Sequence, residues 1–323
     1  MNPDIFVVIE HLRGQVSDLS YVMLAAAREL ANATGGKVMA VLLGHDAESL
    51  ASDLAADRVL YIEHAAFADF SSDAYQHALA NVIKEKMPRV VFFGDTTIGG
   101  DLAPWLSAHL AIPVVSACRT VRAEGDVIKF VSQICGGKLM AEGTLPAPTA
   151  FVMMVPGGYK PEQGRATQAP PIERLDAPTL EEVRVSLKEY IEPAVGDVDI
   201  AKEAILVSIG RGIQNQDNVE LAEELAKALG GVVCASRPVI DQGWLPPTRL
   251  VGKSGKAVKP RLYLALGISG APEHIEAIGD SELIVAINTD TAAPIFNVAK
   301  FGAPVDLLDL APVLTEKVQL AKG

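Results

Sequence analysis

The chain has 323 residues, 49% hydrophobic and 21% charged, a composition that excludes a disordered chain and leaves room for two globular domains. Its 28 Lys and Arg stand against 40 Asp and Glu, and the net charge of −12 argues against nucleic acid as a partner. No apolar run is long enough to cross a membrane and the amino terminus lacks the features of a signal peptide, so we expect no membrane insertion and a cytoplasmic location.

The first half of the chain alternates short apolar runs with segments of helical periodicity, which predicts a parallel sheet flanked by helices. Strands are expected at 5–10, 38–43, 59–62 and 90–93, and helices at 19–33, 48–56, 73–87 and 101–110. Ser17 or Asp18 is the expected N-cap of the first helix, and Gly35 and Gly36 are expected to end it.

The pattern changes near residue 114. Strands are expected at 114–117, 120–123, 127–131 and 150–155 without long helices between them, residues 156–177 are expected to form an irregular loop, and a last strand is expected at 183–187. A linker over residues 193–202 then separates an amino-terminal α/β domain of residues 1–192 from a second domain of residues 203–323.

The second domain has the same alternation. Strands are expected at 204–208, 232–235, 262–266, 283–287 and 304–307. Helices are expected at 219–229, from the end of the glycine turn at 267–271 to about 278, and at 311–321. Polar residues follow these strands: Arg211, Ser236, Arg237, Ser254, Ser269, His274, Asn288 and Asp306. Because carboxyl ends of parallel strands share one edge of a sheet, we expect one elongated ligand site there.

Glycine turns between a strand and a helix occur twice. Gly267-Ile-Ser-Gly-Ala precedes a helix on which His274 lies about one turn in, an arrangement that suits a phosphate. A glycine turn without a ligand and a structural histidine are the alternative. The loop from Gly94 to Leu102 is the second candidate, and its alternative is a polar loop with Asp101 as a helix N-cap.

Several ordered motifs of the second half resemble the carboxyl-terminal domain of the electron-transferring flavoprotein alpha subunit. They are GISGAPEH, IVAINTD and APIFNVAKFGAPVDL, preceded by ASRPVID, VGKSGK and the GRG triplet at Gly210. The resemblance implies FAD bound in an extended pose, in contact with Arg211, Ser236, Arg237, Val251, Gly252, Lys253, Ser254, Ser269, Gly270, Ala271, Pro272, Glu273, His274, Asn288, Asp306 and Leu307.

The same resemblance implies individual roles. Arg237 lies over the flavin ring, Ser254 offers a hydroxyl to flavin N5, and His274 lies near the O2 edge of the flavin. The turn from Ser269 to Ala271 contacts the phosphates, and Asn288 and Asp306 hold the adenosine part. Lys253 departs from the family pattern, which has glutamine at this position.

The function implied by the resemblance is electron transfer. The chain is expected to be the alpha subunit of a heterodimer, with its first domain docking a beta subunit, and to accept electrons from a flavin dehydrogenase such as an acyl-CoA dehydrogenase. The sequence of the Gly94 loop, with its two threonines, resembles that of electron-bifurcating members of the family. One alternative is therefore that the chain is part of an NADH-dependent bifurcating complex.

A nucleotide-binding regulatory module is the alternative of another class, although no G-x-G-x-x-G follows the first strand. We identify no nucleophile–base pair or metal cluster that would indicate substrate chemistry, and the three scattered cysteines favour reduced thiols over an iron–sulfur cluster.

Overall fold

The structure, a computed structural model, describes residues 2–135, 137–180, 183–190 and 198–322. The chain divides into two compact units, residues 1–190 and 191–323. Each unit is an α/β domain with its own sheet and its own apolar cores, which confirms the predicted fold class. Of the expected linker over 193–202, residues 193–197 lie outside the described residues.

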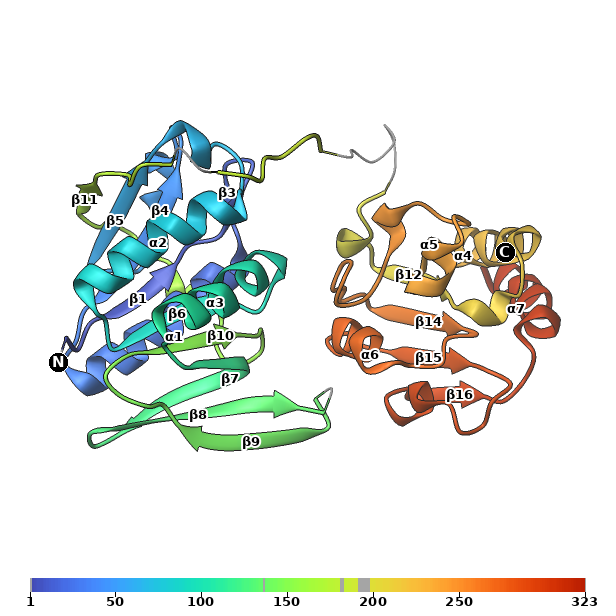
Figure 1. Cartoon of the computed structure of the whole chain (residues 1–323). Helices are drawn as coiled ribbons and strands as arrows, with labels where there is room; N and C mark the ends of the chain where they lie inside the picture. The colour runs from blue at the N-terminus through green and yellow to red at the C-terminus, as the bar shows by residue number, and fades with distance from the viewer. Residues whose placement is uncertain (1, 136, 181–182, 191–197, 323) are drawn as a thin grey trace. The chain divides into compact units, whose positions relative to one another are not determined.

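The first unit is built on a nine-stranded sheet in the order β11-β5-β4-β1-β6-β10-β7-β8-β9 (Figure 1). Strands up to β7 are parallel, and β8 and β9 extend the sheet as antiparallel strands. The strands are β1 Ile5–Val8, β4 Val38–Gly44, β5 Arg58–Glu63, β6 Val90–Gly94, β7 Val114–Glu124, β8 Val127–Ile134, β9 Leu139–Thr144, β10 Ala150–Met154 and β11 Ile172–Leu175, and a small ribbon pairs β2 His11–Leu12 with β3 Gln15–Val16.

Helices cover both faces of this sheet. They are α1 Asp18–Thr34, α2 Ser72–Lys86 and α3 Thr97–Leu110, with 3-10 turns η1 Glu48–Ala51, η2 Ala65–Phe67 and η3 Pro161–Gly164. The central strands are buried on both sides, so two apolar cores form, one on each face. Ser17 accepts the amide hydrogen of Ser20 and caps α1, and Gly35 ends that helix with φ +74°, as predicted.

Several sequence-based expectations for this unit are wrong. The helix expected at 48–56 is only the 3-10 turn Glu48–Ala51. Residues 114–124 form one strand, and β9 and β11 are strands that the pattern does not predict. Residues 183–187 form no strand; instead Arg184 pairs with Asp73 at the start of α2. The N-cap of α3 is Thr96, which lies five residues before the expected Asp101. β9 and β11 are edge strands, where one buried face is enough and apolar alternation is weak.

The second unit has a five-stranded, all-parallel sheet in the order β13-β12-β14-β15-β16, and Figure 1 shows the arrows of β14, β15 and β16 pointing the same way. The strands are β12 Ile205–Ile209, β13 Val232–Ala235, β14 Leu262–Leu266, β15 Ile284–Ile287 and β16 Phe301–Ala303. The helices are α4 Val219–Leu229, α5 Arg237–Asp241, α6 Pro272–Ile278 and α7 Leu307–Lys322, and the 3-10 turns are η4 Ile200–Lys202, η5 Arg211–Ile213, η6 Gln216–Asn218, η7 Pro247–Arg249 and η8 Pro294–Asn297.

The last strand and the last helix of this unit differ from the sequence-based expectation. The strand ends at Ala303 and not at Leu307, and α7 begins at Leu307 and not at Ala311. The carboxylate of Asp306 accepts the backbone amide of Leu308 at 2.9 Å, which starts the helix early.

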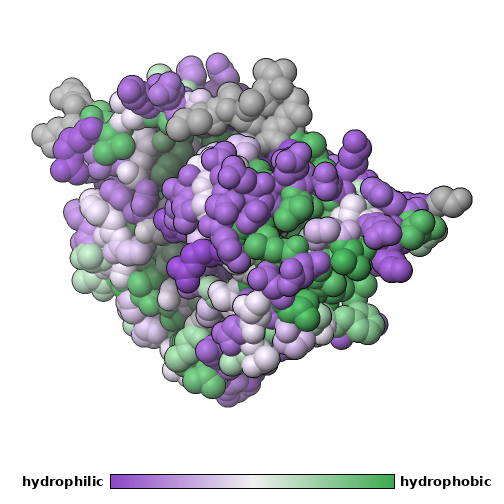
Figure 2. All heavy atoms as spheres, turned by 90° about the vertical axis from the view of Figure 1, so that its right-hand side faces the viewer, coloured by the Kyte–Doolittle hydropathy of each residue, from purple (hydrophilic) through white to green (hydrophobic). Residues whose placement is uncertain are grey.

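One face of the molecule is drawn in Figure 2 and is mixed in polarity. Figure 2 shows hydrophilic residues interspersed with hydrophobic ones on the face that it presents. Within the described ranges, none of the helices combines the length and the hydrophobicity that a membrane crossing needs.

Candidate functional site

The loops that follow β12 and β14 pack against each other through their backbones. The amide of Gly210 donates to Leu266 O at 2.8 Å, and the amide of Gly212 donates to Gly267 O at 3.1 Å. A Cβ atom at Gly212 would lie 2.6 Å from Gly267 Cα, so glycine is required for this approach. Arg211, between the two glycines, is exposed at the carboxyl edge of the sheet.

The turn before α6 leaves backbone donors unused. Gly270 has φ +86°, and a Cβ there would lie 2.4 Å from the amide nitrogen of Ile295, so the turn needs glycine. The amides of Ser269, Gly270 and Ala271 donate to no backbone carbonyl within the described part of the chain, and Ser269 and Ala271 are exposed. Consecutive amides without a backbone partner are the kind of donor set that binds anions, and the phosphate contact expected for this turn stays a prediction.

The edge next to β13 carries Ser236 and Arg237. Ser236 is the N-cap residue of α5 and is buried, with its Oγ 3.5 Å from Ile209 O. The Arg237 side chain is 69% exposed, and its Nε lies 3.4 Å from the carboxylate of Asp241, one helical turn later. The guanidinium charge is therefore partly balanced within α5.

A short loop, residues 251–256, lies beside this edge. The amide of Val251 donates to Ala235 O at 2.9 Å, and the amide of Lys253 donates to Glu273 O at 3.0 Å. Gly252 has φ +147°, which favours glycine, and the side chains of Lys253 and Ser254 that follow it are exposed. The loop therefore presents an ammonium group and a hydroxyl next to the α6 turn.

His274 does not lie open at the helix mouth, as its spacing led us to expect. It is 6% exposed; its Nε2 lies 2.8 Å from the Tyr263 hydroxyl and its Nδ1 lies 3.1 Å from Val251 O. Burial lowers the pKa of His274 to about 4, so its imidazole is neutral at pH 7. Both ring nitrogens have partners inside the domain, and the expected contact of this ring with a ligand stays a prediction.

The remaining positions lie at the other end of the sheet edge. Asn288 Nδ2 donates to Ile268 O at 2.9 Å, which holds the α6 turn beside β15. Asp306 caps α7 through the amide of Leu308, and Leu307 is buried as the first residue of that helix. The structure thus places these residues along one edge, although the side chains of Asn288 and Asp306 also hold loops in place.

Two buried polar residues inside the strands of this sheet escape the sequence pattern. Tyr263 and Ser208 are 0% exposed within strands that are otherwise apolar, and their hydroxyl oxygens are 2.7 Å apart. The only available signal was a tyrosine and a serine at inward positions of the apolar runs LYLAL and ILVSI.

In the first unit, the carboxylate of Glu10, which follows β1, lies against the loop that follows β6. Glu10 is 6% exposed, and its carboxylate accepts hydrogen bonds from the Thr96 hydroxyl at 2.9 and 3.1 Å. Burial raises the pKa of Glu10 to about 7, although the hydrogen bonds from Thr96 and from the Gly94 backbone oppose the shift.

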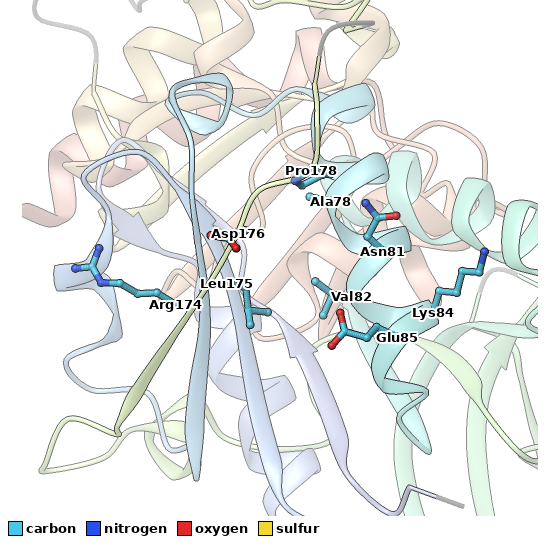
Figure 3. Close-up of a pocket in the computed structure, with 9 residues that line it drawn as sticks. All are labelled: Ala78, Asn81, Val82, Lys84, Glu85, Arg174, Leu175, Asp176 and Pro178. Atoms are coloured by element: carbon cyan, nitrogen blue, oxygen red, sulfur yellow. The ribbon is translucent and has the colours of Figure 1, made fainter.

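A separate hollow of the first unit, with a volume of about 740 Å³, lies between α2 and the segment that follows β11 (Figure 3). It is lined by Ala78, Asn81, Val82, Lys84, Glu85, Arg174, Leu175, Asp176 and Pro178. Its walls carry charges of both signs, and none of the expected ligand residues lines it.

Comparison with known proteins agrees with this geometry. The family model described as electron transfer flavoprotein domain matches residues 5–180, and the one described as electron transfer flavoprotein FAD-binding domain matches residues 199–279. The chain is 35% identical to the electron transfer flavoprotein subunit alpha of Thermoanaerobacterium thermosaccharolyticum, over 99% of this chain and 98% of that protein. This chain is an alpha subunit of the electron transfer flavoprotein family.

Other relatives of this alpha subunit carry related names. The Bacillus subtilis electron transfer flavoprotein subunit alpha is 32% identical, with 98% of each chain covered. The acryloyl-CoA reductase electron transfer subunit beta of Anaerotignum propionicum is 33% identical, over 99% of this chain and 96% of that protein. The family establishes electron transfer, a flavin cofactor and a beta subunit as partner.

The residues present fit a flavin nucleotide. The open amides of residues 269–271 suit its phosphates, and the exposed cations and hydroxyl of Arg237, Lys253 and Ser254 lie on elements joined to that turn through Glu273 and Val251.

Proposed function

We propose that this alpha subunit carries FAD and works as an electron carrier in a heterodimer, taking electrons from a flavin dehydrogenase such as an acyl-CoA dehydrogenase and passing them to a redox partner. The observation that carries the proposal is the turn of residues 269–271, whose three open amides lie within the segment that matches the FAD-binding domain. A dinucleotide needs such an anion site for its pyrophosphate.

In this proposal, FAD accepts and releases electrons, and the residues of the chain bind it and set its potential. The amides of Ser269, Gly270 and Ala271 hold the phosphates, while Asn288 and Asp306 hold the adenosine end. Arg237 and Lys253 place positive charge where reduction adds electron density, which favours the reduced state. Ser254 offers a hydroxyl to N5 of the ring.

We further propose that the first domain, residues 1–192, docks the beta subunit, and that residues 193–202 link it to the FAD domain of residues 203–323. Support comes from the position beside the α3 N-terminus, which holds the buried carboxylate of Glu10. The domain therefore has a structural role in this scheme.

A second candidate is membership of an NADH-dependent electron-bifurcating complex. It is favoured by the Gly94 loop with two threonines and by the relative that is named as an electron transfer subunit of acryloyl-CoA reductase. A regulatory nucleotide-binding module, the alternative of another class, has no comparable support.

Mixing experiments with the purified heterodimer test the proposal. We expect an acyl-CoA dehydrogenase that has been reduced by its substrate to be reoxidised by the heterodimer, which bleaches the flavin absorption of the heterodimer. Reduction by NADH alone would instead favour the bifurcating complex. Failure of every reduced flavin dehydrogenase and of NADH to reduce the bound flavin would contradict both.

A further inference from the structure

A buried chain of polar groups crosses the core of the FAD-binding unit. It runs from Ser208 on β12 through Tyr263 on β14 to His274 on α6, and ends at the backbone carbonyl of Val251. The distances are 2.7, 2.8 and 3.1 Å, and all three side chains are at most 6% exposed. Such a network is retained only if each of its members has a partner, because unpaired buried polar groups are costly.

The positions of the protons follow from the chemistry of the two ends. A carbonyl oxygen can only accept, so Nδ1 of the neutral His274 ring carries the proton that goes to Val251 O. Nε2 is then an acceptor, and the Tyr263 hydroxyl donates to it. The oxygen of the Ser208 hydroxyl lies 2.7 Å from the Tyr263 oxygen and completes the chain.

The end of this chain is a loop that projects side chains to the surface. Val251 is followed by Gly252, whose φ of +147° is accessible mainly to glycine, and then by the exposed Lys253 and Ser254. Backbone hydrogen bonds also hold the loop: Val251 donates to Ala235 O at 2.9 Å and Lys253 donates to Glu273 O at 3.0 Å.

We propose that Tyr263 is a positioning residue for the loop of residues 251–254: its hydroxyl holds the His274 imidazole so that the other ring nitrogen fixes the Val251 carbonyl, and with it the backbone that presents Lys253 and Ser254. The proposal rests on the proposed function only for the identity of the ligand that the loop meets. Tyr263 itself is buried below the loop and acts through His274.

The test uses the heterodimer after its flavin has been removed. Amide hydrogen exchange is followed for Gly252, Lys253 and Gly255, whose amides bond to Lys256 O, Glu273 O and Gly252 O. Tyr263→Phe is expected to accelerate exchange in this loop about tenfold, which corresponds to about 1.4 kcal/mol, while the strands β12 and β14 stay protected. Tyr75→Phe is the matched control, since it removes a buried tyrosine hydroxyl from the other unit.

A double-mutant cycle separates action through His274 from a general loss of stability. His274→Leu should loosen the loop at least as much as Tyr263→Phe, and the double variant should be no looser than His274→Leu. In parallel, FAD is titrated back, and we expect about tenfold weaker binding and an altered visible circular dichroism of the flavin in Tyr263→Phe.

Two results would overturn the proposal: unchanged loop exchange in Tyr263→Phe, or additive effects of the two substitutions in the double variant. If the unsubstituted protein does not rebind FAD, the proposed function fails, but the exchange cycle in the flavin-free protein still decides whether Tyr263 holds the loop.

Discussion

The Thr96 hydroxyl donates a hydrogen bond of 2.9 Å to the carboxylate of Glu10, joining the start of α3 to the end of β1. These elements flank the topological switch point between β1 and β6, where the strand order of the sheet reverses. Open α/β sheets bind ligands at such points. A Cβ atom at Gly94 would lie 2.7 Å from Glu10 Oε1, so the carboxylate is tightly enclosed. The first domain fills this position with its own side chain.

The buried Glu10 makes the stability of the first unit depend on pH. Its pKa is raised from 4.5 to about 7, so between these values the folded chain holds a proton that the unfolded chain releases. The free energy of unfolding therefore falls as the pH rises from about 4.5 to about 7, by up to about 3 kcal/mol from this group. Glu10→Gln should remove this loss.

Urea unfolding at pH 5 and pH 8 measures the effect. Trp105 lies on α3, so its fluorescence in a Trp244→Phe background reports on the first unit alone. The carboxyl groups of Asp57, Glu63 and Asp73 have lowered pKa values and act in the opposite direction, so the difference between the two proteins is the relevant quantity. Glu162 is exposed, so Glu162→Gln is the control. The prediction would be refuted if the free energy of unfolding changed with pH equally in Glu10→Gln and in the unsubstituted protein.

Arg237 should raise the reduction potential of the flavin, and Asp241 should lower it. A unit charge near 4 Å contributes roughly 4 kcal/mol at an effective dielectric of about 20, but exposure and the 3.4 Å ion pair with Asp241 reduce this effect. We expect Arg237→Ala to lower the potential by on the order of 40 mV in a redox titration. Asp241→Asn keeps the arginine without its counter-charge and should shift the potential upward; shifts of the same sign would remove Arg237 from the flavin environment.

Much of this site was predictable because it depends on local signals. The glycines around residues 267–271 follow a buried apolar run, so a strand, a turn with open amides and a helix were expected in that order. Ser17 and Gly35 likewise act within one helical turn of their own position. Such features need no knowledge of distant parts of the chain.

Other features depend on contacts between distant segments. The orientation of His274 is decided by Tyr263 and by the Val251 carbonyl, neither of which is adjacent in sequence. Asp306 was expected at the end of a strand because its neighbours in PVDLL are apolar. In the structure its carboxylate accepts the amide of Leu308 and caps the start of α7. Thr96 was hidden because Glu10, its partner, is 86 positions away.

Lys253 should tune the potential only through a screened charge. Its side chain is exposed on the loop whose backbone Glu273 holds, and the Debye length is about 8 Å at physiological salt. Lys253→Gln, which removes the charge at similar side-chain length, should lower the potential by on the order of 20 mV at low salt and by less at high salt. Lys256→Gln is the control on the same loop, since Lys256 is paired with Asp199 at 2.7 Å. Identical potentials for Lys253→Gln and the unsubstituted protein at low salt would leave the tuning to Arg237, Ser254 and His274.

The chain should require its beta subunit to hold FAD. In the first unit the Glu10 carboxylate occupies the position beside the start of α3, and a docking role is what we propose for this unit. Expression of the chain alone should give poorly soluble protein or protein with little FAD, and coexpression with the beta subunit should restore both properties. A stable, fully flavinated monomer would argue against an obligate heterodimer.

The central claim is that the unit of residues 203–323 binds FAD, and identification of the bound cofactor tests it most directly. The heterodimer is purified, its visible spectrum is recorded, and the cofactor released by denaturation is identified by mass, with the isolated beta subunit as the reference. The account predicts flavin absorption bands and FAD in the heterodimer beyond any nucleotide of the beta subunit, with loss of that FAD when Gly270→Val blocks the turn beside Ile295. A colourless protein that retains NAD, or FAD that persists unchanged in the folded Gly270→Val variant, would contradict it.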